Sequence, residues 1–157
     1  MSDPTADTTS GTEPERPSRL DHVADWLDRR GISSTRSSHA IRAGLSAERL
    51  RVPIRLEVRQ NGGEQPALLF RATGEATYEK EHWGNLAAAC NQWNRGAFLP
   101  TARLATADDV AALVLESWTP LVGDLPAEVI DVHLELLLRS SVAFWRTREQ
   151  NDPTDED

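Results

Sequence analysis

The sequence has one cysteine, almost no lysine and no long apolar run within its 157 residues. The single Cys90 excludes an internal disulfide framework and any CxxC metal or redox motif, which fits a reducing cytoplasm. The longest apolar run spans the six residues 110–115, so we expect no membrane-spanning helix. The N-terminus has no basic region followed by an apolar core, unlike a secretory signal. We therefore expect a soluble cytoplasmic protein.

No motif with established chemistry is found. The histidines lack the HxxxH or HExxH spacing that places two ligands on one helix face, so we expect no metal site: His22, His39, His82 and His133. No phosphate-binding GxxxxGK[ST] loop surrounds Gly62-Gly63, and Ser38 has no GxSxG context. Cys90 lies on the apolar side of a predicted helix, which indicates a core residue rather than a reactive thiol. We expect no enzymatic activity and no cofactor.

The net charge of −8 is concentrated at the two ends of the chain. Residues 1–16 carry −3 and residues 149–157 carry −5, whereas residues 17–148 are neutral. Both ends are rich in Asp, Glu, Thr and Pro, a composition that buries too little apolar surface to offset the entropy lost on ordering. We predict one domain over 17–148 between two disordered acidic tails. These tails keep the protein soluble or, alternatively, serve as ligands for a basic partner.

The neutral part contains a basic segment. Residues 29–71 carry nine Arg and three Glu, a net charge of +6. Such a segment could hold phosphates or an acidic peptide, or it could be the outer face of a sheet paired to acidic elements of the same domain. Phe70 is its only aromatic residue. Because base stacking requires aromatic side chains, we do not expect nucleic acid as the partner.

Periodicity predicts a helix and then a hairpin. A helix over 18–30 is indicated by apolar residues at helical spacing and by Gly31 as a stop: Leu20, Val23, Ala24 and Leu27. The Ser-, Arg- and Gly-rich stretch 33–44 has no period and is interpreted as a loop or a weak edge strand. From residue 52 apolar and polar residues alternate, Asn61-Gly62-Gly63 suits a tight turn, and residues 67–73 form the second strand.

The second half of the chain predicts two further helices. Residues 79–94 form a helix with five residues on one face, namely Trp83, Leu86, Ala87, Cys90 and Trp93. Residues 97–104 are predicted as a strand with Phe98 and Leu104 on one side. Residues 109–118 fit a helix and a strand equally well. A helix over 126–147 starts at Pro126, and its apolar positions cover more than one face.

Five tryptophans are the unusual feature of the composition. Large aromatic side chains dominate both protein cores and interface hot spots. Trp83 and Trp93 share one helix face and are expected in the core. Trp118 and Trp145 lie near the ends of predicted elements, where a groove or a partner surface is an alternative to the core.

Several of these features together resemble a known family. They are the hairpin RLEVRQNGGEQPALLFRA, the helix end NQWNR at 91–95, Phe98 with Pro100, and the closing Ala143-Phe144-Trp145. Over 55–148 the chain is similar to bacterial YbjN-type domains, whose fold is similar to that of type III secretion chaperones. The resemblance implies an α+β fold with helices packed on an antiparallel sheet, in the order α-β-β-β-α-β-β-α, and it favours a strand over 109–118. The sequence departs from the family pattern before residue 52, where the Ser-, Arg- and Gly-rich stretch replaces the expected first strand.

The resemblance implies no enzymatic activity and points to homodimers that hold extended protein segments or modulate regulators. We therefore expect a non-enzymatic protein-interaction module, chaperone-like or a regulatory adaptor, with a protein partner of unknown identity. The candidate interaction residues are Trp118, Trp145, Arg55, Arg59 and Arg71. Two alternatives remain: a small-ligand sensor with a pocket lined by Trp118 and Trp145, and an Arg-face nucleic-acid binder.

The last predicted helix also bears on association. It carries about ten large apolar positions, more than one small sheet and two short helices would cover. A monomer rarely exposes an apolar patch beyond a few hundred Å². We therefore expect a homodimer that buries the same patch on each subunit. The alternative is that the stretch 33–44 folds over this helix and completes the core within one chain.

Overall fold

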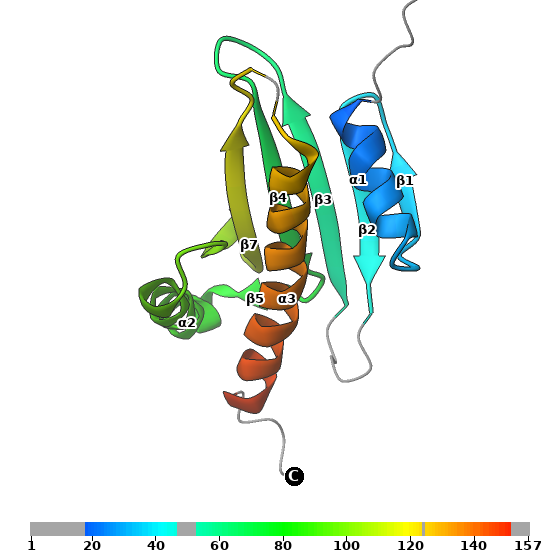
Figure 1. Ribbon diagram of the computed structural model, residues 1–157. Helices are drawn as coiled ribbons and strands as arrows, with labels where there is room; N and C mark the ends of the chain where they lie inside the picture. The colour runs from blue at the N-terminus through cyan, green and yellow to red at the C-terminus, as the bar shows by residue number, and fades with distance from the viewer. Residues whose placement is uncertain (1–17, 47–52, 124, 152–157) are drawn as a thin grey trace, which may run out of the picture.

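The computed structural model describes residues 18–46, 53–123 and 125–151, which form one seven-stranded antiparallel sheet with three α-helices and a short 3-10 helix (Figure 1). The helices are α1 (Arg19–Asp28), η1 (Lys80–His82), α2 (Trp83–Gly96) and α3 (Ala127–Asn151). The strands are β1 (Ser34–Arg36), β2 (Ala40–Leu45), β3 (Ile54–Asn61), β4 (Ala67–Gly74), β5 (Tyr78–Glu79), β6 (Thr101–Ala107) and β7 (Val110–Pro120). They lie in the order β1-β2-β3-β4-β7-β5, and β6 pairs with β7 on the side opposite β4.

The predicted α+β fold is confirmed. When the short strands β1 and β5 are left out, the order along the chain is the predicted α-β-β-β-α-β-β-α. The structure adds a three-residue strand before β2 and a two-residue strand before η1. Both are too short for a period of two to be visible in the sequence.

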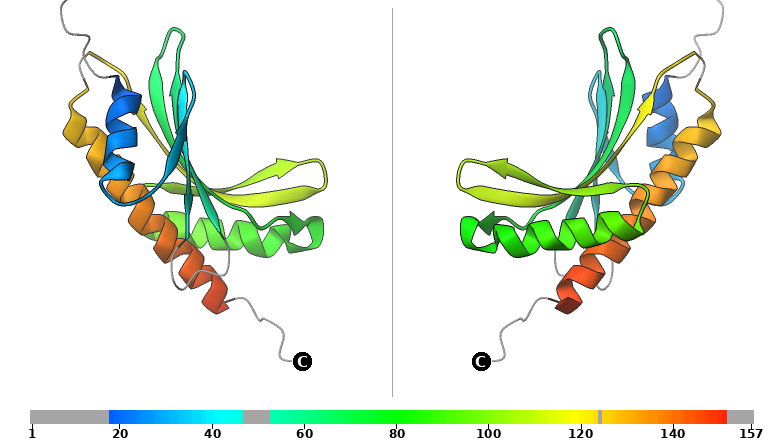
Figure 2. Two further views of the ribbon diagram at one scale, coloured as in Figure 1. Left: turned by 90° about the vertical axis from the view of Figure 1, so that its right-hand side faces the viewer. Right: turned by 90° about the vertical axis from the view of Figure 1, so that its left-hand side faces the viewer.

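The three α-helices lie on one face of the sheet, and the other face is uncovered by the described residues (Figure 2). The sheet bends, so that β6 and the first half of β7 lie over α2, while α1 and α3 pack side by side against the strands from β2 to β7. The uncovered face is the concave side of this bend.

The first part of the sheet comes from the stretch that showed no period in the sequence. Residues 40–45 form β2, an interior strand paired with β3 through Ile41 opposite Val58 and Ala43 opposite Leu56. The interpretation of this stretch as a loop or weak edge strand was therefore wrong for β2 and correct for β1, which is the edge strand. The side chains of Ala40 and Ala43 are buried but too small to produce a clear hydrophobic alternation.

The predicted hairpin over 52–73 is confirmed as β3 and β4. Pro53 precedes the first paired residue, as expected for a residue that cannot donate a ladder hydrogen bond. Gly63 takes a positive φ of 101° in the turn, a conformation that costs glycine little. The next prediction, a strand over 97–104, was wrong at its start, because β6 begins only at Thr101.

The turn between α2 and β6 is held by the end of the helix. The Trp93 indole Nε1 donates to the Pro100 carbonyl at 3.0 Å. The Asn94 amide bonds both backbone groups of Ala102, donating to its carbonyl and accepting from its N–H at 2.8 Å each. Trp93 and Asn94 of the NQWNR segment thus fix the path of the chain from the end of α2 into β6. They leave Phe98, predicted on a strand, in the turn with 96% of its surface exposed.

Residues 110–120 form the strand β7, in agreement with the family resemblance. The predicted last helix is confirmed as α3, which continues to Asn151, so residues 149–151 are helical and do not belong to a tail. The remaining residues of the two predicted tails lie outside the described residues. Most large apolar side chains of α3 are buried against the sheet and α1, and Val132 and Leu136 stay exposed.

Candidate interaction surface

The concave face of the sheet gathers the charged side chains of the strands. Alternation along β3 points Ile54, Leu56 and Val58 into the core, and it points Arg55 and Arg59 to the other face. The register places Arg71 of β4 opposite Glu57 of β3. Trp118 shares this face, because it lies opposite Leu69 of β4. Four of the five predicted interaction residues are therefore on one surface: Arg55, Arg59, Arg71 and Trp118.

One row of this surface alternates in charge across four strands. Arg42 lies opposite Glu57, Glu57 opposite Arg71, and Arg71 opposite Glu116. Opposite charges directly across neighbouring strands stabilise pairing, whereas like charges destabilise it. The row therefore helps to fix the register, because a slip by one residue would move every member to the other face.

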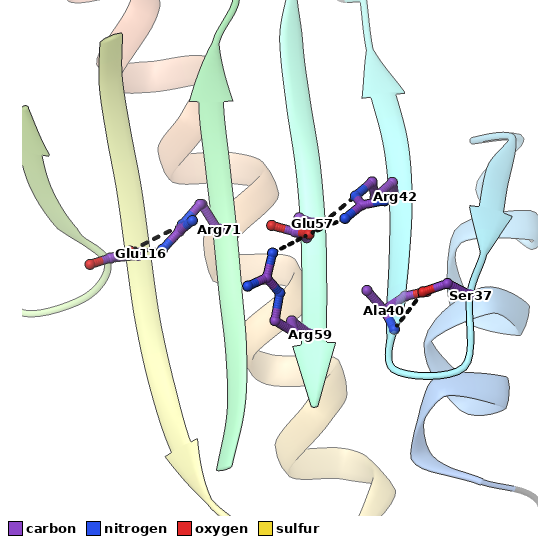
Figure 3. A network of polar contacts seen from close by, with 7 residues as sticks. All are labelled: Ser37, Ala40, Arg42, Glu57, Arg59, Arg71 and Glu116. Atoms are coloured by element: carbon purple, nitrogen blue, oxygen red, sulfur yellow. Dashed lines mark hydrogen bonds and ion pairs between the residues drawn. The ribbon is translucent and has the colours of Figure 1, made fainter. Parts of the chain in front are cut away.

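The first cluster on this row is centred on Glu57. Its Oε1 atom accepts from Arg42 Nε at 3.1 Å and from Arg59 Nη2 at 3.0 Å (Figure 3). Two guanidinium groups thus share one carboxylate. The cluster keeps a charge of +1.

The second cluster has the same composition and is centred on Glu116. Arg103 of β6 donates in a bidentate manner, from Nε to Oε1 at 2.6 Å and from Nη2 to Oε2 at 3.1 Å. Arg71 adds bonds from Nε at 3.2 Å and from Nη2 at 3.1 Å to Oε2 (Figure 3). This cluster also keeps a charge of +1. Arg55 forms a separate and longer pair with Glu75 at 3.4 Å.

Both central carboxylates are held in the charged form. Burial by itself raises the pKa of Glu57, but the hydrogen bonds and charges of Arg59 and Arg42 outweigh it and lower the pKa below 4.5. The pKa of Glu116 is lowered in the same way, because Arg103 and Arg71 outweigh the effect of burial. The side chain of Glu57 is 12% exposed, whereas those of Arg42 and Arg59 are 51% and 39% exposed. The carboxylates therefore lie beneath a layer of guanidinium groups.

An apolar position lies beside the charged clusters. Leu69 points to the concave face between Arg59 and Trp118, and it is nevertheless buried. Trp118 itself is 48% exposed. The surface therefore offers an aromatic side chain next to guanidinium groups, a combination enriched at protein interfaces.

Trp145, the fifth predicted interaction residue, lies in the core and is 1% exposed. It packs edge-to-face on Phe144 and lies against Gly74 of β4. Trp118 points away from the helices. Because the two tryptophans lie on opposite sides of the sheet, they do not line a common pocket, as the alternative of a ligand sensor would require.

A different groove lies between α2 and the C-terminal part of α3. Its volume is about 680 Å³. Trp93 and Phe144, which pack edge-to-face, line it together with small residues such as Ala89 and Ala97. Gln92, Thr147 and Arg148 supply polar groups. This mixture is typical of sites for small apolar molecules.

His133 and Cys90 lie on the helix-covered side of the sheet, where His133 is half-buried and Cys90 is buried. His133 of α3 stacks on Phe70 at 4.9 Å and bonds the hydroxyls of Thr119 at 2.6 Å and Ser117 at 3.3 Å. Burial lowers the pKa of His133 below 6.5 and raises the pKa of the Cys90 thiol. Among residues 18–46, 53–123 and 125–151, no three His, Cys, Asp or Glu side chains are grouped to hold a metal ion.

Of the six residues in the two charged clusters, the sequence predicted only Arg59 and Arg71 as interaction residues. Arg42 lies in the stretch without a period, and Arg103 and Glu116 lie outside the basic segment 29–71. Glu57 could have been found because it lies two residues from Arg59 on the same strand, and side chains two apart share a face. Glu116 could have been found in the same way, because it lies two residues from Trp118. The pairing of the two strands with β4 was not available from the sequence.

Comparison with known proteins agrees with the resemblance seen in the sequence. None of the helices that the structure describes has the combination of length and hydropathy that a membrane span requires. No match is found among curated proteins. The crystal structure of YbjN, "a putative transcription regulator from E. coli", aligns with a TM-score of 0.59 and 18% identity, covering 85% of this chain and 93% of that one. At this identity the likeness shows the fold alone.

A family model matches most of the amino-acid sequence of the chain. The model described as "YbjN: Putative bacterial sensory transduction regulator" matches residues 19–147. The matched range begins at the start of α1, includes the whole sheet and ends within α3. The chain belongs to the YbjN family.

Proposed function

We propose that the protein is a non-enzymatic regulatory module that binds a partner protein on the concave face of its sheet. The observation that carries this proposal is the convergence of Arg55, Arg59, Arg71 and Trp118 on a face that the described helices leave uncovered. A concave sheet face with an exposed tryptophan suits the holding of an extended protein segment, as in a chaperone or an adaptor. The family description as a regulator supports the same role.

Affinity capture from the native host with matched variants tests this function. The double variant R59A/W118A removes two neighbours of Leu69, and R139A removes an exposed arginine of α3 that pairs with Glu135. We expect a specific partner to be retained by the wild type and R139A and lost from R59A/W118A, with equal thermal stability of all three. A set of captured proteins that is unchanged by R59A/W118A would contradict the proposal.

We further propose that the module is a homodimer. Val132 and Leu136 lie one turn apart on α3 and remain exposed after the sheet and α1 have packed against this helix. The apolar patch is smaller than the sequence indicated, so the dimer contact is expected to be weak. Sedimentation over a tenfold dilution series at micromolar concentration should show a dimer that V132D/L136D converts to a monomer. A single species near 17.4 kDa for the wild type would exclude it.

A second candidate function is that of a small-ligand sensor, which the groove between α2 and α3 favours. A planar apolar molecule would lie against Trp93 and Phe144. A thermal-shift screen of aromatic and aliphatic acids tests this function, with A89W as the variant that fills the groove. Ligands that raise the melting temperature of the wild type and W118A, but not of A89W, would support it.

A further inference from the structure

We propose that the concave face recognises an extended acidic protein segment whose carboxylates are three residues apart, an inference that rests on the proposed protein-binding function. Four arginines and two glutamates form the clusters around Glu57 and Glu116, namely Arg42, Arg59, Arg71 and Arg103. Each cluster keeps one positive charge that its own carboxylate does not neutralise. The partner must supply the missing negative charges.

The spacing of the clusters sets the spacing of the ligand's carboxylates. Glu57 is on β3 and Glu116 on β7, and β4 lies between them. Because neighbouring strands are about 4.8 Å apart, the two clusters lie about 10 Å apart across the sheet. An extended polyproline-type segment rises about 3.1 Å per residue with three residues per turn. Carboxylates at i and i+3 therefore point the same way and are separated by about 9 Å.

The layering of the clusters directs their charge toward the ligand. The carboxylates lie beneath the guanidinium groups, and the Arg42 side chain is about four times as exposed as that of Glu57. A guanidinium group has five donors in a fixed planar fork, so it can serve a second carboxylate while it keeps the first.

The same features disfavour nucleic acid on this face. Binding to a phosphate backbone depends on the number of phosphates that basic residues neutralise. Here the surplus is two charges, and the two clusters hold ionised glutamates that a continuous row of phosphates would approach. The net charge of −8 adds a general repulsion. A peptide with two separated carboxylates avoids both costs.

Fluorescence anisotropy with labelled synthetic peptides and the full-length protein tests the inference. The probe is the peptide Gly-Ser-Asp-Pro-Thr-Asp-Ser-Gly, with amidated C-terminus, whose two carboxylates are three residues apart. We expect it to bind at least tenfold more tightly than a peptide with the two Asp adjacent or with both replaced by Asn. Equal binding of the three peptides would overturn the inference.

Matched charge reversals distinguish the effect of a charge on the concave face from the effect of the protein's net charge on peptide binding. R59E and R139E change the net charge equally, and each arginine pairs with a glutamate, but only Arg59 is on the concave face. R59E should lose at least tenfold in affinity, whereas R139E should stay within twofold of the wild type. A peptide with Lys in place of both Asp should bind R59E/R103E better than it binds the wild type. Equal losses in R59E and R139E would overturn the inference.

Further measurements test the inference if R59E does not fold or if another ligand binds this face. If R59E fails to fold, R59Q and the peptide-induced NMR shifts of the Trp118 indole and the Arg103 amide replace it, and the absence of shifts on this face would count against the inference. A twelve-residue single-stranded oligonucleotide that binds more tightly than the peptide would assign the face to nucleic acid instead. If R59A/W118A loses its captured partner while no acidic peptide binds, the protein-binding function stands and this inference fails.

Discussion

The two faces of the sheet differ in the interactions that stabilise them, because one face packs apolar side chains and the other carries ion pairs. On β4, Phe70 points to the helices, is fully buried and stacks on His133, whereas its neighbour Arg71 points to the concave face and bonds Glu116. The helix-covered face removes apolar area from water, which contributes most of the stability of a domain. The concave face carries partly exposed ion pairs, each worth at most about 1 kcal/mol. The comparison indicates that the arginines of the concave face are available for binding, because their ion pairs contribute little to the stability of the fold.

Truncation of adjacent residues on β4 should separate the two faces most clearly. Phe70→Ala removes a fully buried ring and should lower the free energy of unfolding by about 3–5 kcal/mol. Arg71→Ala should lower it by less than about 1 kcal/mol, because its ion pair is partly exposed. Urea denaturation of the two variants measures both values. Similar losses for the two would contradict the division into a stabilising and a binding face.

A close approach on the helix-covered face provides a second test. A Cβ at Gly74 would lie 2.6 Å from Nε1 and 3.1 Å from Cε2 of Trp145, which is held in the core. Gly74→Ala should therefore cost about 1–3 kcal/mol through overpacking. Gly84→Ala on α2 is the control, because nothing lies within 4 Å of its Cβ, and it should stabilise the helix by up to about 1 kcal/mol. Thermal unfolding that ranks Gly74→Ala as the more stable variant would exclude this packing.

The half-buried His133 is expected to make the stability of the helix-covered face depend on pH. Because burial lowers the pKa of His133 below 6.5, the unfolded chain takes up the proton first as the pH falls. The contribution of neutral His133 is therefore fully present above pH 6.5 and is progressively lost below it. Denaturation series at pH values from about 8 to 5 should show this decline in the wild type and a flatter profile in H133Q. Parallel profiles would assign the decline to other groups.

The smallest change is expected on the concave face. Glu57→Gln removes one charge from a cluster of two arginines and should lower the free energy of unfolding by at most about 1 kcal/mol. High salt should reduce the difference, since partly exposed charges are screened. Because the pKa of Glu57 is lowered below 4.5, its contribution is present above that pH and is lost as the pH falls through the folded-state value. A loss as large as that of Phe70→Ala would place Glu57 in the stabilising part of the molecule.

The sequence predicted the elements whose apolar side chains are large and regularly spaced. Leu56 and Val58 on β3 are examples, and this strand occurs where expected. The helix predicted over 79–94 was wrong at its start, because Tyr78–Glu79 form β5, Lys80–His82 form a 3-10 helix and α2 begins only at Trp83. The strand β2 was missed because alanine and glycine occupy it in part, so burial leaves little trace in hydropathy. The start of β6 was misplaced because side chain to backbone bonds from Trp93 and Asn94, rather than periodicity, fix the preceding turn.

The candidate surface was predictable only in part, because the sequence shows the alternation within one strand but not the register between strands. Alternation along one strand places Arg55 and Arg59 on the same face, but only the register between strands brings Arg71 beside Glu57 and Glu116. Trp145 was considered for this surface because the last helix was expected to end at residue 147. The helix continues to Asn151, and Trp145 is buried because its side chain lies against Gly74 of β4.

The amide of Asn94 has a consequence for how the protein behaves at high concentration. β6 is an edge strand, and the backbone groups of Ala102 that point away from β7 would otherwise be open to a strand from another molecule. Asn94 occupies both groups with one donor and one acceptor, as a neighbouring strand would. A single side chain thus ends the sheet at Ala102 and blocks the addition of a strand from another molecule at this point.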